Sequence, residues 1–360
     1  MRQNTTSGVT LKYPDAVGFA FNPCLLVASN TQRMDITVSD GTDTLAVTYY
    51  GFNGEAYADI RAYVQALFKE KEFGNISYST TAQKVATGKN IYISVTATTV
   101  GGTAVAFSTI TVFYVWGALK IGAQERFNGY RRLTYFANYP WTFGVYVTGA
   151  TSIKFGSNGR SVTGEGVWNV APNIAAGAQT VIVYDSNGTV SNITFDTTFD
   201  FTFHLTAGTR NQAIATITVD REANEGYYLR WLNRQGMWCY WLFKEGAGKY
   251  QSAVDGEFWR KNIIEYDQSY GYQGGAVRYQ SHNRQEVIPV CVPLVDRDTW
   301  MYLLDIISSP LVDLYTGTSN GVPQWVSVNV QAGTTTRDMK AELSDFMCNI
   351  QLPEVPTQHL

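Results

Sequence analysis

The chain has 360 residues, of which 14% are aromatic and only 16% are charged, and its formal net charge is −3. This length exceeds what one hydrophobic core usually serves, so two or three domains are expected. The near-neutral charge argues against the basic surface that nucleic-acid binding needs, and the abundance of aromatic, Thr, Ser, Val and Gly residues favours sheets over helices.

The sequence indicates no targeting segment, membrane span or cofactor site. Residues 1–13 are polar and lack the apolar core of a signal peptide, and no run of about 18 apolar residues occurs that could span a membrane. The four cysteines, Cys24, Cys239, Cys291 and Cys348, lie far apart and show no C-x-x-C spacing. They are expected to be buried thiols, with disulfides or a structural metal as the alternatives, and no cofactor is predicted.

Residues 1–121 are predicted to form a β-domain with one helix. The helix is placed between Asn53 and Gly74, because Ala56, Ile60, Val64 and Leu67 recur at helical spacing. The segment Gly122–Tyr139, rich in Gly, Asn and Arg, places a connecting loop over residues 122–140. Strands are predicted at residues 17–21, 25–28, 34–38, 45–50, 91–99 and 107–116.

Two further β-domains are predicted after the loop. Residues 141–220 carry five short strand-like segments and suggest a small sandwich, with a hairpin turn at residues 185–188. Residues 221–360 combine a hairpin, several strands and one helix that Asp296 caps, with Trp300, Leu303, Leu304 and Ile307 on its buried side. The predicted fold class is therefore mainly β: several small β-sandwich or barrel-like domains, two of them with one helix packed on a sheet.

The hairpin expected at residues 226–243 is the most aromatic part of the chain. Its second arm is apolar on both faces, so it is either central to a domain core or packed against another subunit. Arginines among aromatics are typical of interfaces. The candidate interface or ligand residues are Trp231, Trp238, Trp241, Trp259, Arg230, Arg234, Tyr270 and Tyr272.

No catalytic or metal site is predicted. The three histidines have no metal or triad partners nearby in sequence, and no nucleophile, zinc or phosphate-binding motif occurs in a suitable context. One cluster of carboxylates, Asp255, Glu257, Glu265 and Asp267, lies beside Trp259 and could serve a glycoside hydrolase. Neighbouring arginines favour ion pairs there instead, with Arg260 or Arg278, so the protein is not expected to be an enzyme.

Several phrases of the sequence resemble a known group of proteins. Val-Gly-Phe-Ala-Phe-Asn-Pro at 17–23, Phe-Tyr-Val-Trp-Gly-Ala-Leu at 113–119, Tyr-Leu-Arg-Trp-Leu-Asn-Arg-Gln-Gly at 228–236 and Glu-Tyr-Asp-Gln-Ser-Tyr-Gly-Tyr-Gln-Gly at 265–274 look like uncharacterised proteins of gut Bacteroides phages and prophages. The resemblance runs over most of the chain but includes no catalytic motif. It implies a distal-tail-like or baseplate protein that is made in the host cytoplasm and becomes part of the virion tail.

Two functional hypotheses follow. The first is a structural component of a phage tail or baseplate that forms a homo-oligomer, such as a ring, and contacts other tail proteins. The second is a carbohydrate-binding or adhesion module in which some of Trp231, Trp238, Trp241 and Trp259 form an exposed platform that stacks on a cell-surface glycan. An enzyme acting on glycans is the third and weakest alternative. The exposure of the hairpin tryptophans distinguishes the first two.

Overall fold

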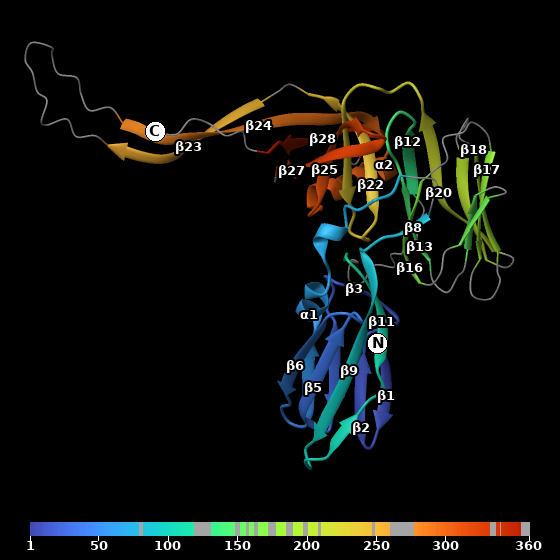
Figure 1. The fold of residues 1–360 in the computed structure, drawn as a ribbon, viewed down its shortest axis with the longest axis vertical. Helices are drawn as coiled ribbons and strands as arrows, with labels where there is room; N and C mark the ends of the chain where they lie inside the picture. Colours follow the sequence, from blue (N-terminus) through green and yellow to red (C-terminus); the bar gives the residue numbers. More distant parts are fainter. Residues whose placement is uncertain are drawn as a thin grey trace, which may run out of the picture. The chain divides into compact units, whose positions relative to one another are not determined.

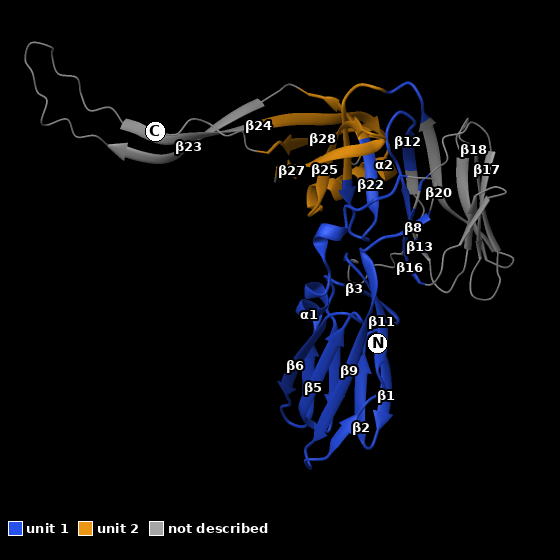
Figure 2. Ribbon diagram, viewed as in Figure 1, with its two compact units in different colours: residues 1–223, 231–241 blue, residues 224–230, 242–360 orange. Residues whose placement is uncertain are grey.

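The computed structural model describes the chain except residues 79–81, 119–130, 148–151, 156–157, 162–164, 172–177, 185–189, 197–200, 208–209, 247–248, 260–276, 332–335, 339 and 354–360. The chain is mainly β, as the composition indicated, and its strands belong to several sheets (Figure 1). It forms two compact units, residues 1–223 with 231–241 and residues 224–230 with 242–360 (Figure 2). The finer division into three domains stays a prediction.

The first unit begins with two sheets whose apolar faces form a common core. Alternating side chains of β5 are buried, namely Met34, Ile36 and Val38, and β9 buries Ile91, Ile93 and Val95 in the same way. One sheet has the order β1 (Arg2–Thr6), β2 (Val9–Tyr13), β4 (Leu25–Ser29), β7 (Glu55–Asp59). The other has the order β3 (Val17–Phe19), β11 (Ile110–Val115), β9 (Gly88–Thr99), β5 (Thr31–Ser39), β6 (Thr44–Tyr50), and β10 (Ala104–Ala106) also pairs with β9.

The helix predicted between Asn53 and Gly74 is only partly correct. Its first third is the strand β7, in which Ala56 and Ala58 are buried while Glu55 and Tyr57 are exposed, a period of two. Asn53 lies at φ +51° in the turn before β7 and caps no helix. The helical part is α1 (Arg61–Ala66), followed by a single 3-10 turn, η1 (Glu70–Glu72).

The remaining strands of the first unit form three smaller sheets. Residues 131–136, predicted to lie in the connecting loop, are the strand β12, and Leu133 and Tyr135 are buried on it. The turn predicted at 185–188 lies outside the described residues. The strand orders are β12 (Arg131–Phe136), β20 (Arg210–Asp220), β19 (Phe201–Ala207); β13 (Phe143–Val147), β16 (Gly166–Val170), β8 (Ala82–Lys84); and β15 (Asn158–Ser161), β14 (Ser152–Phe155), β17 (Ala178–Tyr184), β18 (Val190–Asp196).

The predicted hairpin is confirmed as β21 (Tyr227–Leu232) and β22 (Trp238–Glu245). Both strands contribute residues to each of the two units, because the division passes through them at residues 230–231 and 241–242. They belong to a sheet with the order β26 (Val322–Ser327), β25 (Val312–Ser319), β21, β22, β24 (Val277–Val295), β28 (Ser344–Gln351), β27 (Asn329–Val330), and β23 (Lys249–Trp259) pairs with β24.

The helix of the second unit, α2 (Arg297–Ser308), is confirmed with its cap. The side chain of Asp296 accepts a hydrogen bond from the Thr299 N–H at 2.8 Å, which satisfies one of the free donors of the first turn. Trp300 and Leu303 are buried as predicted, whereas Leu304 and Ile307 are only half-buried and Ile306 continues the buried side. The indole of Trp300 meets Phe346 of β28 edge-on, with ring centroids 5.7 Å apart.

Candidate functional site

The turn of the aromatic hairpin is built by Asn233 and Gly236. The Asn233 side-chain oxygen accepts from the N–H groups of Gln235 and Met237, and Gly236 takes φ +72°, a conformation that side chains disfavour. The Asn233 N–H donates to the Met237 carbonyl at 2.9 Å and closes the turn. The Asn233 hydrogen bonds and the positive φ of Gly236 are features of a tight turn, so the hairpin could be predicted from these residues alone.

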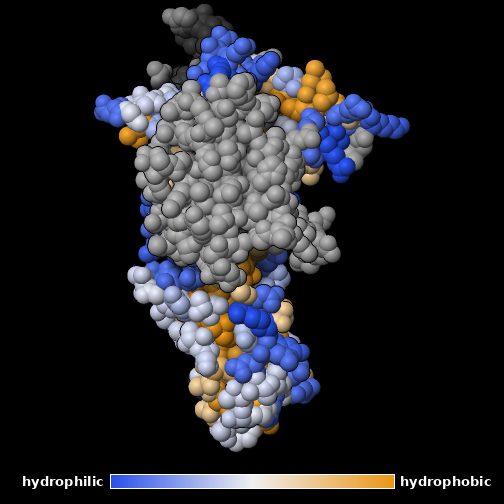
Figure 3. Space-filling model, turned by 90° about the vertical axis from the view of Figure 1, so that its right-hand side faces the viewer, coloured by the Kyte–Doolittle hydropathy of each residue, from blue (hydrophilic) through white to orange (hydrophobic). Residues whose placement is uncertain are grey.

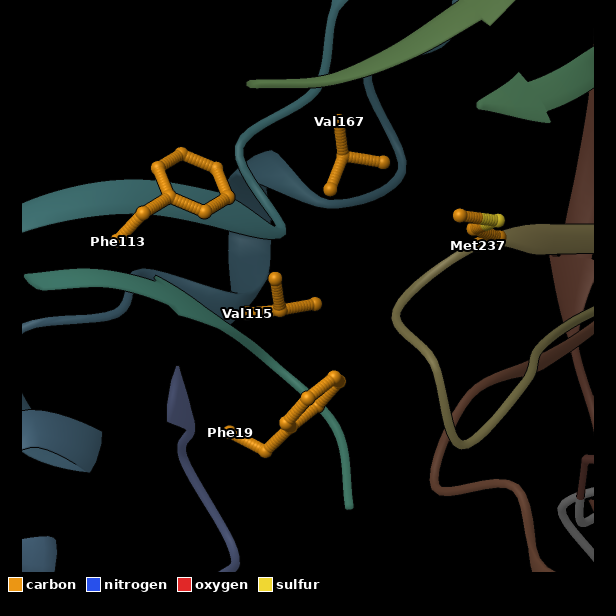
Figure 4. Close-up of a cluster of buried hydrophobic side chains, with 5 residues drawn as sticks. All are labelled: Phe19, Phe113, Val115, Val167 and Met237. Carbon is orange, nitrogen blue, oxygen red and sulfur yellow. The ribbon is translucent and has the colours of Figure 1, made fainter. Parts of the chain in front are cut away.

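The turn packs against the N-terminal sheets of the first unit. The Thr87 hydroxyl donates to the Gly236 carbonyl at 2.8 Å, and the Ala118 N–H donates to the Arg234 carbonyl at 2.7 Å. A Cβ atom at Gly236 would lie 2.6 Å from a methyl carbon of Val115, so only glycine fits. Figure 4 shows the buried cluster that accompanies these contacts, formed by Phe19, Phe113, Val115, Val167 and Met237.

The hairpin tryptophans are core residues of the chain itself. Trp231, Trp238 and Trp241 are 0%, 4% and 7% exposed. The Trp238 indole N–H donates to the Phe73 carbonyl at 2.9 Å, and the Trp241 ring meets Phe136 edge-on at 5.5 Å. Trp231, Trp238 and Trp241 therefore cannot form the exposed sugar-stacking platform that the second hypothesis assigned to them. The sequence left two environments open for the hairpin, a domain core or the surface of another subunit. The structure shows that the hairpin lies in a core of its own chain.

Arg230 is also buried, with 5% of its surface exposed. Within the second unit its guanidinium makes an ion pair with Asp313 at 2.9 Å and lies over the ring of Trp325, 4.4 Å from the centroid. The ion pair and the cation–π contact offset part of the cost of burying the charge. Arg230 therefore has a structural contact within its own chain. Arg234, by contrast, has an exposed side chain.

The other sequence candidates fall outside what the structure describes. Trp259, Asp255 and Glu257 belong to β23, of which only the backbone is described. Tyr270, Tyr272, Glu265 and Asp267 lie in the segment 260–276, beyond the described residues. The ion pairs predicted for this cluster remain predictions.

A different aromatic group is exposed on the first unit. Its three residues, Tyr50, Phe52 and Tyr57, are 78%, 81% and 60% exposed. Tyr50 ends β6, Phe52 lies in the turn that follows, and Tyr57 lies on β7. Asn53 and Gly54 both take positive φ and form the tight turn between them. Sequence reasoning missed this group because Tyr50 ends a predicted strand, whereas Tyr57 falls within the predicted helix. The Asn-Gly pair followed by the alternation of Glu55, Ala56, Tyr57 and Ala58 was the available signal.

Polar side chains lie beside this aromatic group on the outer face of β5 and β6. Arg33 is the cross-strand partner of Tyr50, and Asp35 is that of Thr48. The Thr48 hydroxyl donates to Asp35 at 2.6 Å, Arg33 donates to the same carboxylate oxygen, and these hydrogen bonds lower the pKa of Asp35. Arg33 and Asp35 thus form a neutral pair, and the exposed aromatic rings are the distinguishing feature of this surface.

One hollow of about 230 Å³ lies near the start of the first unit, with Cys24 and Tyr114 in its wall. Burial raises the pKa of the Cys24 thiol to about 11, so the thiol stays protonated at neutral pH and is a poor nucleophile. Burial raises the pKa of Tyr114 as well. This hollow is smaller than a typical ligand pocket and holds no activated group for catalysis.

All four cysteines are free thiols, as predicted, but only Cys24 and Cys239 are fully buried, whereas Cys291 and Cys348 are half-buried. Cys291 and Cys348 lie on the neighbouring strands β24 and β28, but each faces a different partner, Met347 and Val290. Burial raises the pKa of Cys348 to about 12. Within the described residues, no group of three or more His, Cys, Asp or Glu side chains is arranged to hold a metal ion.

Among the helices in the described part of the chain, none is long and apolar enough to cross a membrane.

No family model matches the chain, and no curated protein matches it. Among solved structures, the fibronectin(III)-like modules of Clostridium thermocellum CbhA align with 60% of this chain and 98% of that chain, at 12% identity and a TM-score of 0.18. A TM-score this low carries no argument about relationship. The structure thus defines the protein as mainly β, with several sheets.

Proposed function

We propose that this protein is a structural component of a phage tail or baseplate, similar to a distal-tail protein, which acts by assembling with copies of itself and with other tail proteins. The observation that carries the proposal is the aromatic group Tyr50, Phe52 and Tyr57, which is exposed at one edge of the N-terminal sheets. Neighbouring aromatic residues with 60% or more of their surface exposed are typical of a surface that another molecule covers.

Two further features support assembly. The sequence phrases at 17–23, 113–119, 228–236 and 265–274 resemble those of Bacteroides phage proteins. The low content of charged residues, 16%, gives little electrostatic repulsion between copies. The space-filling view shows apolar residues interspersed with polar ones over the N-terminal part of the first unit (Figure 3).

Deleting the gene from an inducible prophage tests the proposal. The expected result is particles with incomplete tails in electron micrographs, and supplying the gene in trans should restore complete tails. Complete, infectious particles from the deletion strain would contradict the proposal. Complete particles that fail to adsorb to the host would favour the second candidate.

The second candidate is an adhesion module. The exposed rings of Tyr50, Phe52 and Tyr57, and not the buried hairpin tryptophans, would bind the glycan. Tyrosine and phenylalanine stack on sugar rings, and the Tyr57 hydroxyl donates to Glu55, which leaves a polar edge beside the ring. A Phe52→Ala/Tyr57→Ala variant should lose binding to host-surface polysaccharide if this candidate is right. A Val322→Ala variant, at an exposed apolar residue of β26, is the matched control.

A further inference from the structure

Strand β6 is the outermost strand of its sheet (Figure 1), and its sequence lacks the charges and the proline that usually protect such an edge. Edge strands avoid unwanted pairing by carrying charges or proline, or by being short. The other edges of the two N-terminal sheets follow this rule: β1 carries Arg2, β7 carries Glu55 and Asp59, and β3 and β10 have three residues each. The sequence of β6, Thr-Leu-Ala-Val-Thr-Tyr-Tyr, has seven residues and contains neither a charge nor a proline.

The backbone groups that β6 presents at its free edge follow from its pairing with β5. The Gly51 N–H donates to the Gln32 carbonyl at 2.8 Å, so in this antiparallel register Tyr49, Val47 and Leu45 also bond to β5. The N–H and C=O groups of Thr44, Ala46, Thr48 and Tyr50 therefore point away from β5. Among the described residues, no backbone hydrogen bond reaches these groups.

The side chains of β6 are suited to pairing with a second copy of the same strand. An antiparallel pair centred on Val47 would place Thr44 opposite Tyr50 of the partner, and Ala46 opposite Thr48 of the partner. On the inner face, the half-buried Leu45 would lie opposite Tyr49 of the partner, and Val47 would lie opposite Val47 of the partner. All of these cross-strand pairs are neutral, and the inner ones are apolar, which favours the pairing.

We propose that two copies of this protein associate through β6, which forms a continuous sheet across a two-fold axis centred on Val47. Such a contact is isologous, because the same strand serves both copies. The exposed rings of Tyr50, Phe52 and Tyr57 lie beside the paired edges and become partly covered. This inference rests on the proposed assembly function, because it identifies one contact through which copies of the protein join.

An Ala46→Pro variant tests the contact without disturbing β5. The Ala46 N–H faces away from β5, so proline removes only the outward donor, and proline is tolerated at such edge positions. Sedimentation velocity over about 1 to 200 µM spans the affinities expected of a small interface. The parent protein should dimerise in this range and the proline variant at least about tenfold more weakly. An Ala46→Thr variant keeps the donor and should dimerise like the parent.

A pair of double variants tests the register and does not depend on proline. Ala46→Lys/Thr48→Lys places two lysines opposite each other across the axis and should abolish the dimer, whereas Ala46→Glu/Thr48→Lys places opposite charges there and should preserve it. Both carry the same change at Thr48, so its effect on Asp35 within the chain cancels. Circular dichroism spectra matching the parent confirm that each variant is folded.

The inference is overturned if the folded parent stays monomeric throughout, or if the proline and the double-lysine variants associate as the parent does. In the latter case another surface drives assembly, and the proposed tail function survives while the β6 contact does not.

Discussion

Trp300 tests the packing of α2 at the level of a single side chain. It is 5% exposed and contacts Phe346 of β28. Replacing it with alanine removes a large apolar surface and leaves a cavity, so Trp300→Ala should lower the free energy of unfolding of the second unit by about 3 to 5 kcal/mol. Chemical denaturation followed by circular dichroism measures this change. Met301→Ala, at a residue that is 49% exposed, should have little effect, and an equal loss for the two variants would refute the assigned orientation of α2.

Asp40 links three elements of the first unit and makes its stability depend on pH. Its carboxylate lies 2.9 Å from the Lys89 ammonium, which also donates to the Leu67 carbonyl at the end of α1. Burial alone would raise the pKa of Asp40, but hydrogen bonds from the Asp43 and Thr42 N–H groups and from Lys89 outweigh it and lower the pKa to about 2. The folded chain therefore favours the ionised carboxylate more than the unfolded chain does.

The sign of this effect gives a specific prediction. Because the pKa of Asp40 is lowered on folding, its stabilisation is complete above about pH 4 and is lost as the pH falls towards 2. Asp40→Asn should lower the free energy of unfolding near pH 7 by about 2 kcal/mol and reduce the loss between pH 4 and 2. Thermal melts across this pH range check it. Asp43→Asn, which breaks only the exposed pair with Lys69, should change little.

At the scale of elements, the hairpin turn is the contact most sensitive to a small change. Gly236 has φ +72°, and an added Cβ would meet Val115 at 2.6 Å and the Trp116 carbonyl at 3.0 Å. Gly236→Ala should lower the free energy of unfolding by more than the roughly 1 to 2 kcal/mol that a left-handed backbone alone costs an alanine. Gly102→Ala is the matched control, since Gly102 has φ +85° and no atom within 4 Å of the added Cβ. Equal losses in thermal stability would show that the turn does not pack as described.

The sequence predicted the local elements better than it predicted which residues pack against them. The hairpin, its turn and the cap of α2 depend on local chemistry, namely the Asn233 side chain, the freedom of Gly236 and the Asp296 carboxylate, so the sequence is sufficient to place them. The helix predicted from Asn53 failed where two periodicities overlap. Ala56 and Ile60 fit a helical spacing, but Ala56 and Ala58 also fit a strand, and pairing with β4 decides in favour of the strand.

The candidate site was harder to predict because burial is a property of the whole fold. The doubly apolar hairpin correctly indicated that Trp238 and Trp241 must be covered, but not that residues as distant as Phe73 and Phe136 of the same chain cover them. The exposed group at Tyr50, Phe52 and Tyr57 was missed for the opposite reason. Nothing in an aromatic residue's type shows that its ring faces water.

At the scale of the whole molecule, assembly is supported by surface features and not by the aromatic hairpin. The hairpin tryptophans are buried within one chain and offer no surface to a second copy. Support now comes from the low charge, the resemblance to phage proteins, the exposed aromatic group and the unprotected edge of β6. Exposed aromatic rings and an unpaired strand edge are typical of a surface that another molecule covers.

Quantitative mass spectrometry of purified phage particles tests the central claim most directly. If the protein is a tail or baseplate component, it should remain with the particles through a density gradient, at a constant ratio of several copies per particle. Its peptides should also be recovered from isolated tails. A protein found only in the unassembled fraction of the lysate, and absent from particles whose other tail proteins are detected, would contradict the account.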